Sequence, residues 1–225
     1  MILHALKERW INITMNIPDN FHIVDHSLIK HKLSILRHIK TKSKEFRELT
    51  TEITSLLAYQ ATKNLALSSC EIETPITVTK GYKVKLDNIV FVPILRAGLG
   101  MIEGMLSLIP NGRVGYIGME RDHNTHKPVD YYFKIPKQAD QKTFIVLDPM
   151  LATGGTMIAA IDRLKDLGAK DIHSICIISS PEGMNQFCNN HRDVNIYTGV
   201  LDEKLNENKY IVPGLGDAGD RLYGT

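Results

Sequence analysis

The chain has 225 residues, 43% of them hydrophobic and 23% charged, which fits a soluble globular protein with one large domain, or one domain and an appendage. A formal net charge of +2 gives no sign of the broad basic face that a nucleic-acid partner would need, and no run approaches the ~20 apolar residues of a membrane span. The three cysteines form no C-x-x-C pair, so we expect neither a disulfide framework nor a zinc site, and a reducing, cytoplasmic location.

The first part of the chain predicts helices. Residues 1–24 show no clear period and no signal-peptide pattern, and we interpret them as an extension before a single domain of residues 25–225. From Ser27 onward apolar residues recur at helical spacing, and a second helix is expected after Thr41 or Ser43 as its cap. The apolar face of the second helix would carry Phe46, Leu49, Ile53, Leu56 and Leu57.

Strands then alternate with helices. Strands are predicted at 74–85, 88–95, 113–119, 143–148, 171–179 and, as the last one, 194–202. Helices are predicted at 98–108, 154–167 and 181–190. This alternation predicts an α/β fold, with a central, mainly parallel sheet flanked by helices.

A polar stretch at 120–136 with aromatic residues after it is interpreted as a long β-hairpin arm with its turn near Asn124. We expect the arm to fold over the site or to pack on a neighbouring subunit, which would exclude water during the reaction. His123 and His126 lie on this arm and are interpreted as solvated.

The segment FIVLDPMLATGGT, residues 144–156, carries the strongest chemical signal. An apolar strand ends in Asp148, and glycines 154 and 155 precede a helical pattern. Ligands of an open parallel sheet bind beyond the carboxyl ends of its strands, and a glycine-rich turn at a helix start presents N–H groups to an anion. Since a carboxylate beside a phosphate needs a hydroxyl or a metal between them, the pattern favours a sugar phosphate.

The C-terminal segment reads GLGDAG at 214–219, which matches the dinucleotide fingerprint letter for letter. That fingerprint requires a following helix and strand, and only residues 220–225 follow here, so a dinucleotide-binding oxidoreductase is rejected.

Three motifs together resemble those of uracil phosphoribosyltransferases, which are type I phosphoribosyltransferases. VLDPMLATGGT resembles the phosphoribosyl-pyrophosphate signature, with Pro149 where many relatives of the fold carry a second acid. VPILRAGLGM, residues 92–101, resembles the pyrophosphate loop, and YIVPGLGDAGDRLYGT, residues 210–225, resembles the uracil-binding segment. The resemblance runs from about residue 25 to the end and implies the type I fold with a β-arm and a C-terminal base-binding segment.

The resemblance implies an enzyme of pyrimidine salvage that converts uracil and 5-phospho-α-D-ribose 1-diphosphate (PRPP) to UMP and diphosphate. It implies that Arg96 and Arg121 hold the diphosphate and that Ile211, Gly216, Asp217 and Ala218 contact uracil, with Asp217 also toward PRPP or its metal. Arg96 and Asp217 are the candidate catalytic residues. No general base stands out from the sequence: Asp217 could accept the proton of uracil N1, or the proton could leave through water. The remaining PRPP contacts that it implies are Asp148, Pro149, Met150, Leu151, Ala152, Thr153, Gly154, Gly155 and Thr156.

Magnesium is expected mainly on the diphosphate oxygens, and no residue is named as its ligand. Family members are commonly dimers or larger assemblies and some respond to GTP, so a homo-oligomer is expected and GTP is a candidate effector. Glu120 stands where the family more often has an aromatic residue.

Two rival functions stay open from the sequence. One is a regulator of pyrimidine genes with the same fold, against which the near-neutral charge and the intact base segment argue. The other is an enzyme for purines or orotate, and orotate would need a cation, for which Arg221 is the outside candidate.

Overall fold

The computed structural model describes residues 16–121 and 128–225, and for residues 120, 121, 128 and 129 it describes the backbone alone. The strands of the main sheet are β1 (Phe21–Ile23), β4 (Ile89–Leu95), β5 (Arg113–Val114), β6 (Tyr116–Arg121), β7 (Pro128–Lys134), β8 (Thr143–Leu147), β9 (Met150–Leu151), β10 (Asp171–Ser179) and β11 (Asn195–Leu201). Two further pairs are β2 (Leu67–Glu73) with β3 (Val78–Val84), and β12 (Lys204–Leu205) with β13 (Ile211–Val212).

The helices are α1 (Ser27–Arg37), α2 (Ser43–Ala61), α3 (Ile102–Leu108), α4 (Gly155–Asp166), α5 (Pro181–Asn190) and α6 (Ala218–Tyr223). Short 3-10 helices lie at η1 (Leu86–Asn88), η2 (Ala97–Met101) and η3 (Ala139–Gln141).

The central sheet has the strand order β1-β11-β10-β8-β4-β6-β7, with β5 beside β4 and β9 beside β10. All of these neighbours run parallel except β6 and β7, which are antiparallel. The predicted α/β class with a mainly parallel sheet is therefore confirmed. β4 is buried along almost its whole length, as its continuous apolar sequence predicts for a strand covered on both faces.

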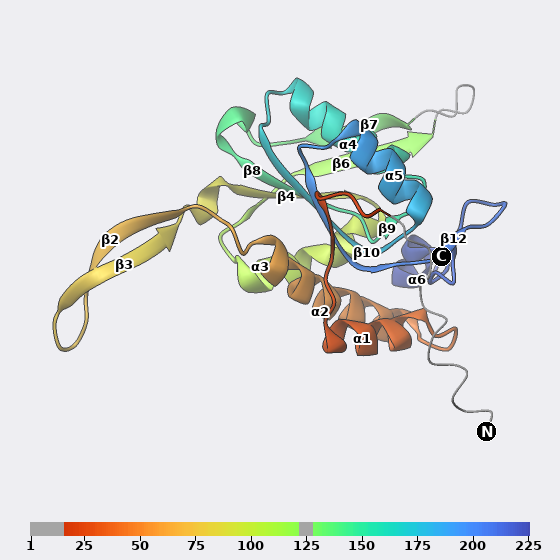
Figure 1. The fold of residues 1–225 in the computed structure, drawn as a ribbon, viewed down its shortest axis with the longest axis horizontal. Helices are drawn as coiled ribbons and strands as arrows, with labels where there is room; N and C mark the ends of the chain where they lie inside the picture. Colours follow the sequence, from red (N-terminus) through yellow and green to blue (C-terminus); the bar gives the residue numbers. More distant parts are fainter. Residues whose placement is uncertain (1–15, 122–127) are drawn as a thin grey trace.

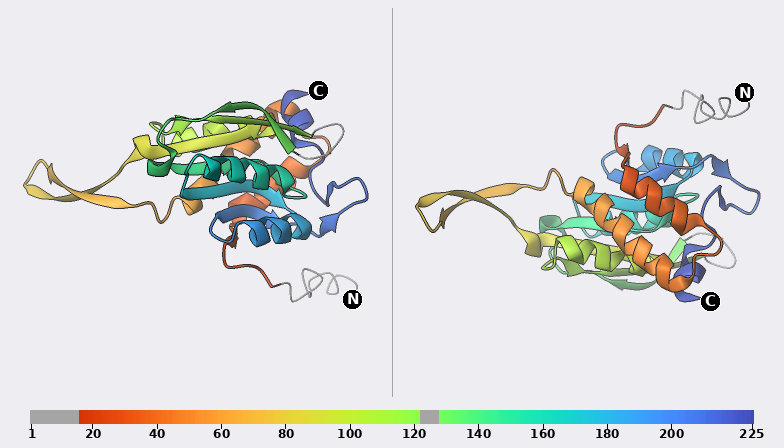
Figure 2. Two further views of the ribbon diagram at one scale, coloured as in Figure 1. Left: turned by 90° about the horizontal axis from the view of Figure 1, so that it is seen from above. Right: turned by 90° about the horizontal axis from the view of Figure 1, so that it is seen from below.

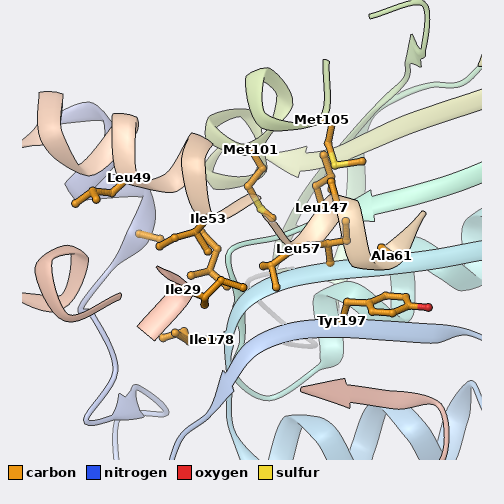
Figure 3. Packing of buried hydrophobic residues seen from close by; sticks show 14 of the residues in the cluster. Ile29, Leu49, Ile53, Leu57, Ala61, Met101, Met105, Leu147, Ile178 and Tyr197 are labelled. Atoms are coloured by element: carbon orange, nitrogen blue, oxygen red, sulfur yellow. The ribbon is translucent and has the colours of Figure 1, made fainter. Parts of the chain in front are cut away.

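Two apolar layers hold the helices on the sheet. On one face α1, α2 and α3 cover the strands, and α4 and α5 cover the other (Figure 1). Figure 3 shows the first layer, in which Ile53 and Leu57 of α2 lie among Met101, Met105 and Leu147, all fully buried. The expected helical face of α2 is confirmed, with Leu56 at its half-buried border.

Several boundaries differ from the predictions for local reasons. Thr41 does not cap α2, because its hydroxyl donates to Ile35 O at the end of α1, and the capping position is Lys42 without a side-chain bond. The helix predicted at 98–108 divides into η2 and α3. Gly115 interrupts the strand predicted at 113–119, and residues 194–202 do not hold the last strand because β12 and β13 follow.

Strand pairing at the N-terminal side also departs from the prediction. Phe21–Ile23 pairs in parallel with β11, so residues assigned to the extension already belong to the sheet. The strand predicted at 74–85 begins at Val78, and its partner β2 was not predicted. These two strands form a hairpin that projects from the end of the molecule opposite α6 (Figures 1 and 2).

The predicted arm at 120–136 is confirmed as a hairpin by the antiparallel pairing of β6 and β7. Its turn near Asn124 lies outside the described residues, as do His123 and His126. None of the helices in the described ranges has the length and hydropathy of a membrane span.

Candidate active site

The carboxyl ends of the parallel strands bring the predicted site segments to one edge of the sheet. Arg96 follows β4, Asp148 follows β8 and Ser180 follows β10, and these three strands are neighbours. α6 and the β12–β13 pair lie at the same end of the molecule, as Figures 1 and 2 both show. This is the edge at which an open parallel sheet binds its ligands.

The loop from Asp148 to Thr156 presents backbone at the start of α4. Gly154 precedes the helix with φ of 81°, a left-handed conformation that strains residues with a side chain. A Cβ atom built on Gly155 would meet only Thr153 Oγ1, at 3.8 Å, so the space beside this glycine is open. The loop therefore offers unobstructed N–H groups and threonine hydroxyls at a helix N-terminus, which suits a phosphate.

A support beneath this loop was missed by the sequence analysis. The Ser180 hydroxyl donates to Ala152 O at 2.6 Å and accepts from Gly183 N at 2.9 Å, and Ser180 N donates to Leu151 O. A Cβ on Gly183 would lie 2.4 Å from Ala152 O, so the first turn of α5 packs directly on the loop. The Ser-Pro-x-Gly sequence at the start of α5 is the signal that could have pointed to it.

Asp148 has a perturbed acidity. Burial raises the pKa of its carboxyl from the ordinary 3.8 to about 7, the hydrogen bond from Met150 N opposes the rise, and repulsion from Asp217 adds to it. Asp148 as a residue is half-buried, as expected for an acid at the edge of a site that a ligand can reach. A Cβ on Gly98 would lie 2.4 Å from Leu147 O, and one on Gly219 would lie 3.8 Å from Arg96 Nη2, so the end of β8 and the C-terminal segment both lie against the turn that carries Arg96.

Arg96 lies between these two segments. The Leu95–Arg96 peptide is cis, and the Arg96 side chain is 59% exposed. Its Nη2 is 3.6 Å from Asp220 Oδ1, and its carbonyl accepts from the Tyr223 hydroxyl at 3.1 Å. An exposed guanidinium at the mouth of the site can pair with two phosphoryl oxygens at once.

The base-binding segment turns through glycines. Gly214 and Gly216 have φ of 62° and 80°, and Gly216 is exposed whereas Ile211 and Ala218 are buried. Asp217 caps α6 by accepting from Asp220 N at 2.9 Å. The segment therefore presents main-chain groups around Gly216 to the site, with the neighbouring side chains packed inward.

Arg221 is engaged elsewhere and does not serve as a cation for orotate. Its guanidinium donates to Leu215 O and His38 O at 2.9 and 2.8 Å, and it stacks over Phe46 with 4.5 Å to the ring centroid. Arg47 donates to Leu222 O in the same way. These contacts hold the C-terminal segment against α1 and α2.

Two expectations lie outside what the structure describes. The Arg121 backbone ends β6 at the same edge of the sheet, but its side chain is beyond the described part, as is that of Glu120.

Within the described residues no group of three or more acidic, histidine or cysteine side chains is arranged to hold a metal ion.

Comparison with known proteins gives one consistent result. A family profile described as uracil phosphoribosyltransferase matches residues 23–225. A uracil phosphoribosyltransferase from Dictyoglomus turgidum is 55% identical over 203 residues, 90% of this chain and 98% of that protein. One from Streptococcus mutans is 54% identical over 205 residues, 91% of this chain and 98% of that protein. A solved structure of an Aquifex aeolicus protein superposes with a TM-score of 0.86 at 38% identity, covering 91% of this chain and 98% of that one.

Proposed function

The chain belongs to the uracil phosphoribosyltransferase family, and from this premise we propose roles for its residues in the reaction that it catalyses. The enzyme converts uracil and PRPP to UMP and diphosphate, a step of pyrimidine salvage. The observation that carries the residue roles is the meeting of Arg96, the end of β8 and the C-terminal segment around α6 at one sheet edge. The regulator alternative is set aside, because the relatives are named as enzymes.

The loop at the start of α4 binds the phosphoribosyl group. Backbone N–H groups from Ala152 to Thr156, with the two threonine hydroxyls, hold the 5-phosphate. Asp148 accepts hydrogen bonds from the ribose hydroxyls, which favours its ionised form against the effect of burial. Pro149, Met150 and Leu151 shape the loop by pairing with β10.

Arg96 and Arg121 stabilise the leaving diphosphate. The bond between the anomeric carbon and the diphosphate oxygen breaks, positive charge develops on the ribose ring, and N1 of uracil forms the new bond and releases its proton. Because negative charge grows on the diphosphate, fixed guanidinium donors contribute most in the transition state. The proton passes from N1 either to Asp217 or directly to water.

The base is recognised by backbone groups of Ile211, Gly216 and Ala218. Uracil offers two carbonyls and two N–H groups along its edge, and a glycine-rich segment can approach them closely. Cytosine replaces one carbonyl acceptor by an amino group, which would leave a buried donor of the enzyme unpaired.

Magnesium fits the chemistry of these groups, because it prefers carboxylate and phosphate oxygens and keeps several waters. The diphosphate oxygens would mainly hold it, and when bound it would neutralise part of the diphosphate charge.

The protein forms a homo-oligomer, and the β2–β3 hairpin supports this proposal. Ile76 at its turn is 93% exposed, and Leu67, Val78 and Tyr82 are also exposed on a two-stranded unit that projects from the body. A second copy would cover these side chains. Replacing Ile76 by Ser and Val78 by Thr should lower the molecular mass of the particle measured by sedimentation, and replacing the exposed Tyr59 of α2 by Ser should not.

A cytoplasmic location and activation by GTP stay predictions.

The substrate assay mixes the enzyme, magnesium and PRPP with uracil, cytosine, orotate or hypoxanthine and measures diphosphate release. Release with uracil alone is expected, and release with hypoxanthine or orotate would contradict the base assignment. Arg96→Ala should lower kcat/KM for PRPP by about 10²–10³, the effect of one such donor. Arg192→Ala, an exposed arginine after the far end of α5, should leave the rate unchanged. An unchanged rate for Arg96→Ala would remove its proposed role.

A further inference from the structure

A partly buried ion pair joins α1 to the loop after β11. Arg37 in the last turn of α1 donates to both carboxylate oxygens of Asp202, with 2.9 Å from Nη1 to Oδ2 and 2.6 Å from Nη2 to Oδ1. The side chains are 20% and 4% exposed, respectively. A bidentate pair of this kind fixes both distance and orientation, which a single contact does not.

The same two side chains hold one residue of the base-binding segment from both sides. Arg37 Nη1 donates to Gly214 O at 2.9 Å, and Gly214 N donates to Asp202 Oδ2 at 3.1 Å. Gly214 is tightly enclosed, since a Cβ there would lie 2.0 Å from Ile211 O. Its N–H and C=O groups are therefore both tied to the ion pair, two residues before Gly216.

Asp202 also connects this arrangement to the phosphate side of the site. The backbone N of Asp202 donates to the carbonyl of Ser179, the last residue of β10, at 2.8 Å. The following residue, Ser180, supports the phosphoribosyl loop through its hydrogen bond to Ala152 O. The next residue after Asp202, Glu203, donates to Val212 O of β13. The base segment and the phosphoribosyl loop are therefore both anchored to the ends of β10 and β11.

We propose that Arg37 and Asp202 are positioning residues that set the place of uracil relative to the ribose, and so contribute to base selectivity. The inference rests on the proposed base-binding role of residues 211–218. Removing the negative charge of Asp202 or the fork of Arg37 frees the Gly214 peptide groups, so the segment would meet the base in several positions. Binding of the phosphoribosyl group, which uses other residues, would be preserved.

The variants are Asp202→Asn, which keeps the shape but brings an N–H₂ group against a donor, and Arg37→Lys, which keeps the charge but loses the fork. Lys32→Met is the matched control, because Lys32 lies on the same helix and pairs with Glu52 of α2, away from the base segment. Thermal unfolding establishes that each variant is folded. If Asp202→Asn is unfolded at the assay temperature, Arg37→Lys decides the test.

Calorimetric titration with UMP and with ribose 5-phosphate separates base contacts from phosphoribosyl contacts without turnover. We expect both variants to bind UMP about tenfold or more weakly, the loss of one charge-assisted hydrogen bond, and to bind ribose 5-phosphate within about twofold of the parent. In steady-state kinetics the KM for uracil should rise while the KM for PRPP stays constant. The ratio of kcat/KM for uracil to kcat/KM for cytosine should fall.

Equal losses for UMP and ribose 5-phosphate, or parent-like UMP binding in both folded variants, would overturn the inference. Failure of the proposed reaction would look different, because the parent enzyme itself would then bind UMP no more tightly than ribose 5-phosphate.

Discussion

Asp148→Asn is expected to make the ligand-free protein more stable and less active. The folded-state pKa of Asp148, about 7, lies above its ordinary value of 3.8 because burial disfavours the charged carboxylate. Between these two pH values the folded protein keeps a proton that the unfolded chain releases. The contribution of Asp148 to the free energy of unfolding therefore falls as the pH rises through this window, and is constant above it. Because asparagine has no proton to release, the variant does not lose this stability as the pH rises.

The size of the effect follows from the same values. The interval from 3.8 to about 7 corresponds to about 4 kcal/mol at 1.36 kcal/mol per pH unit, which is an upper bound. Because Asp148 is half-buried and not fully enclosed, we expect about half of this value, roughly 2 kcal/mol. Asparagine can still accept from Met150 N, the 3.3 Å contact of the present carboxylate, so the loop geometry is kept.

The assay is urea unfolding of the parent and Asp148→Asn at about pH 4, the acid edge of the window, and at about pH 8, above it. The two proteins should be nearly equal in stability at the lower pH, and the variant should be more stable at the higher pH. Its kcat/KM for PRPP should fall by about tenfold or more, because an amide accepts ribose hydroxyls less strongly than a carboxylate. Asp166→Asn, at the exposed end of α4, is the control. A stability difference that does not change with pH would refute the reasoning.

Three further changes test the support of the site and the core. Ser180→Ala should lower the free energy of unfolding by about 1–3 kcal/mol and raise the KM for PRPP, because Ala152 O and Gly183 N lose their partner; an unchanged KM in steady-state assays would count against the support. Leu57→Ala, in the layer under α2, should lower stability by about 2–5 kcal/mol in denaturant unfolding without changing either KM. Burial, followed by repulsion from Lys165, lowers the pKa of His191, so the contribution of His191 to the free energy of unfolding falls as the pH drops below 6.5, where the unfolded chain takes up a proton. In unfolding measured against pH, His191→Gln should therefore gain stability relative to the parent as the pH drops below 6.5.

The sequence predicts most of the sheet because its strands are buried on both faces and read as continuous apolar runs. β10 and α5 have the predicted bounds, since Ser180 caps α5 and Pro181 is its first residue, the positions that these two residue types favour at a helix start. β2 escaped prediction because almost every residue in it is exposed, so no alternation of apolar and polar residues marks it. β1 is three residues long, too short for any period to show.

The site segments are predictable from local motifs, but their supports are not. The phosphate loop is contiguous, and its glycines and Asp148 carry a recognisable pattern. The pairing of Arg37 with Asp202 joins residues 165 positions apart, and neither has a neighbouring motif that announces the other. The hydrogen bonds from Arg221 to backbone carbonyls could not be predicted either, because an arginine near a site is first interpreted as a ligand contact.

Cys70 on β2 gives the projecting hairpin a thiol that can be labelled. It is half-buried, whereas Cys176 and Cys188 are buried, and burial raises the pKa of these two thiols to about 12 and about 11. A maleimide dye would therefore attach first to the hairpin, far from the sheet edge where substrates meet (Figure 2). Its fluorescence would report on what the hairpin touches while catalysis continues undisturbed, so assembly and chemistry become observable in one sample.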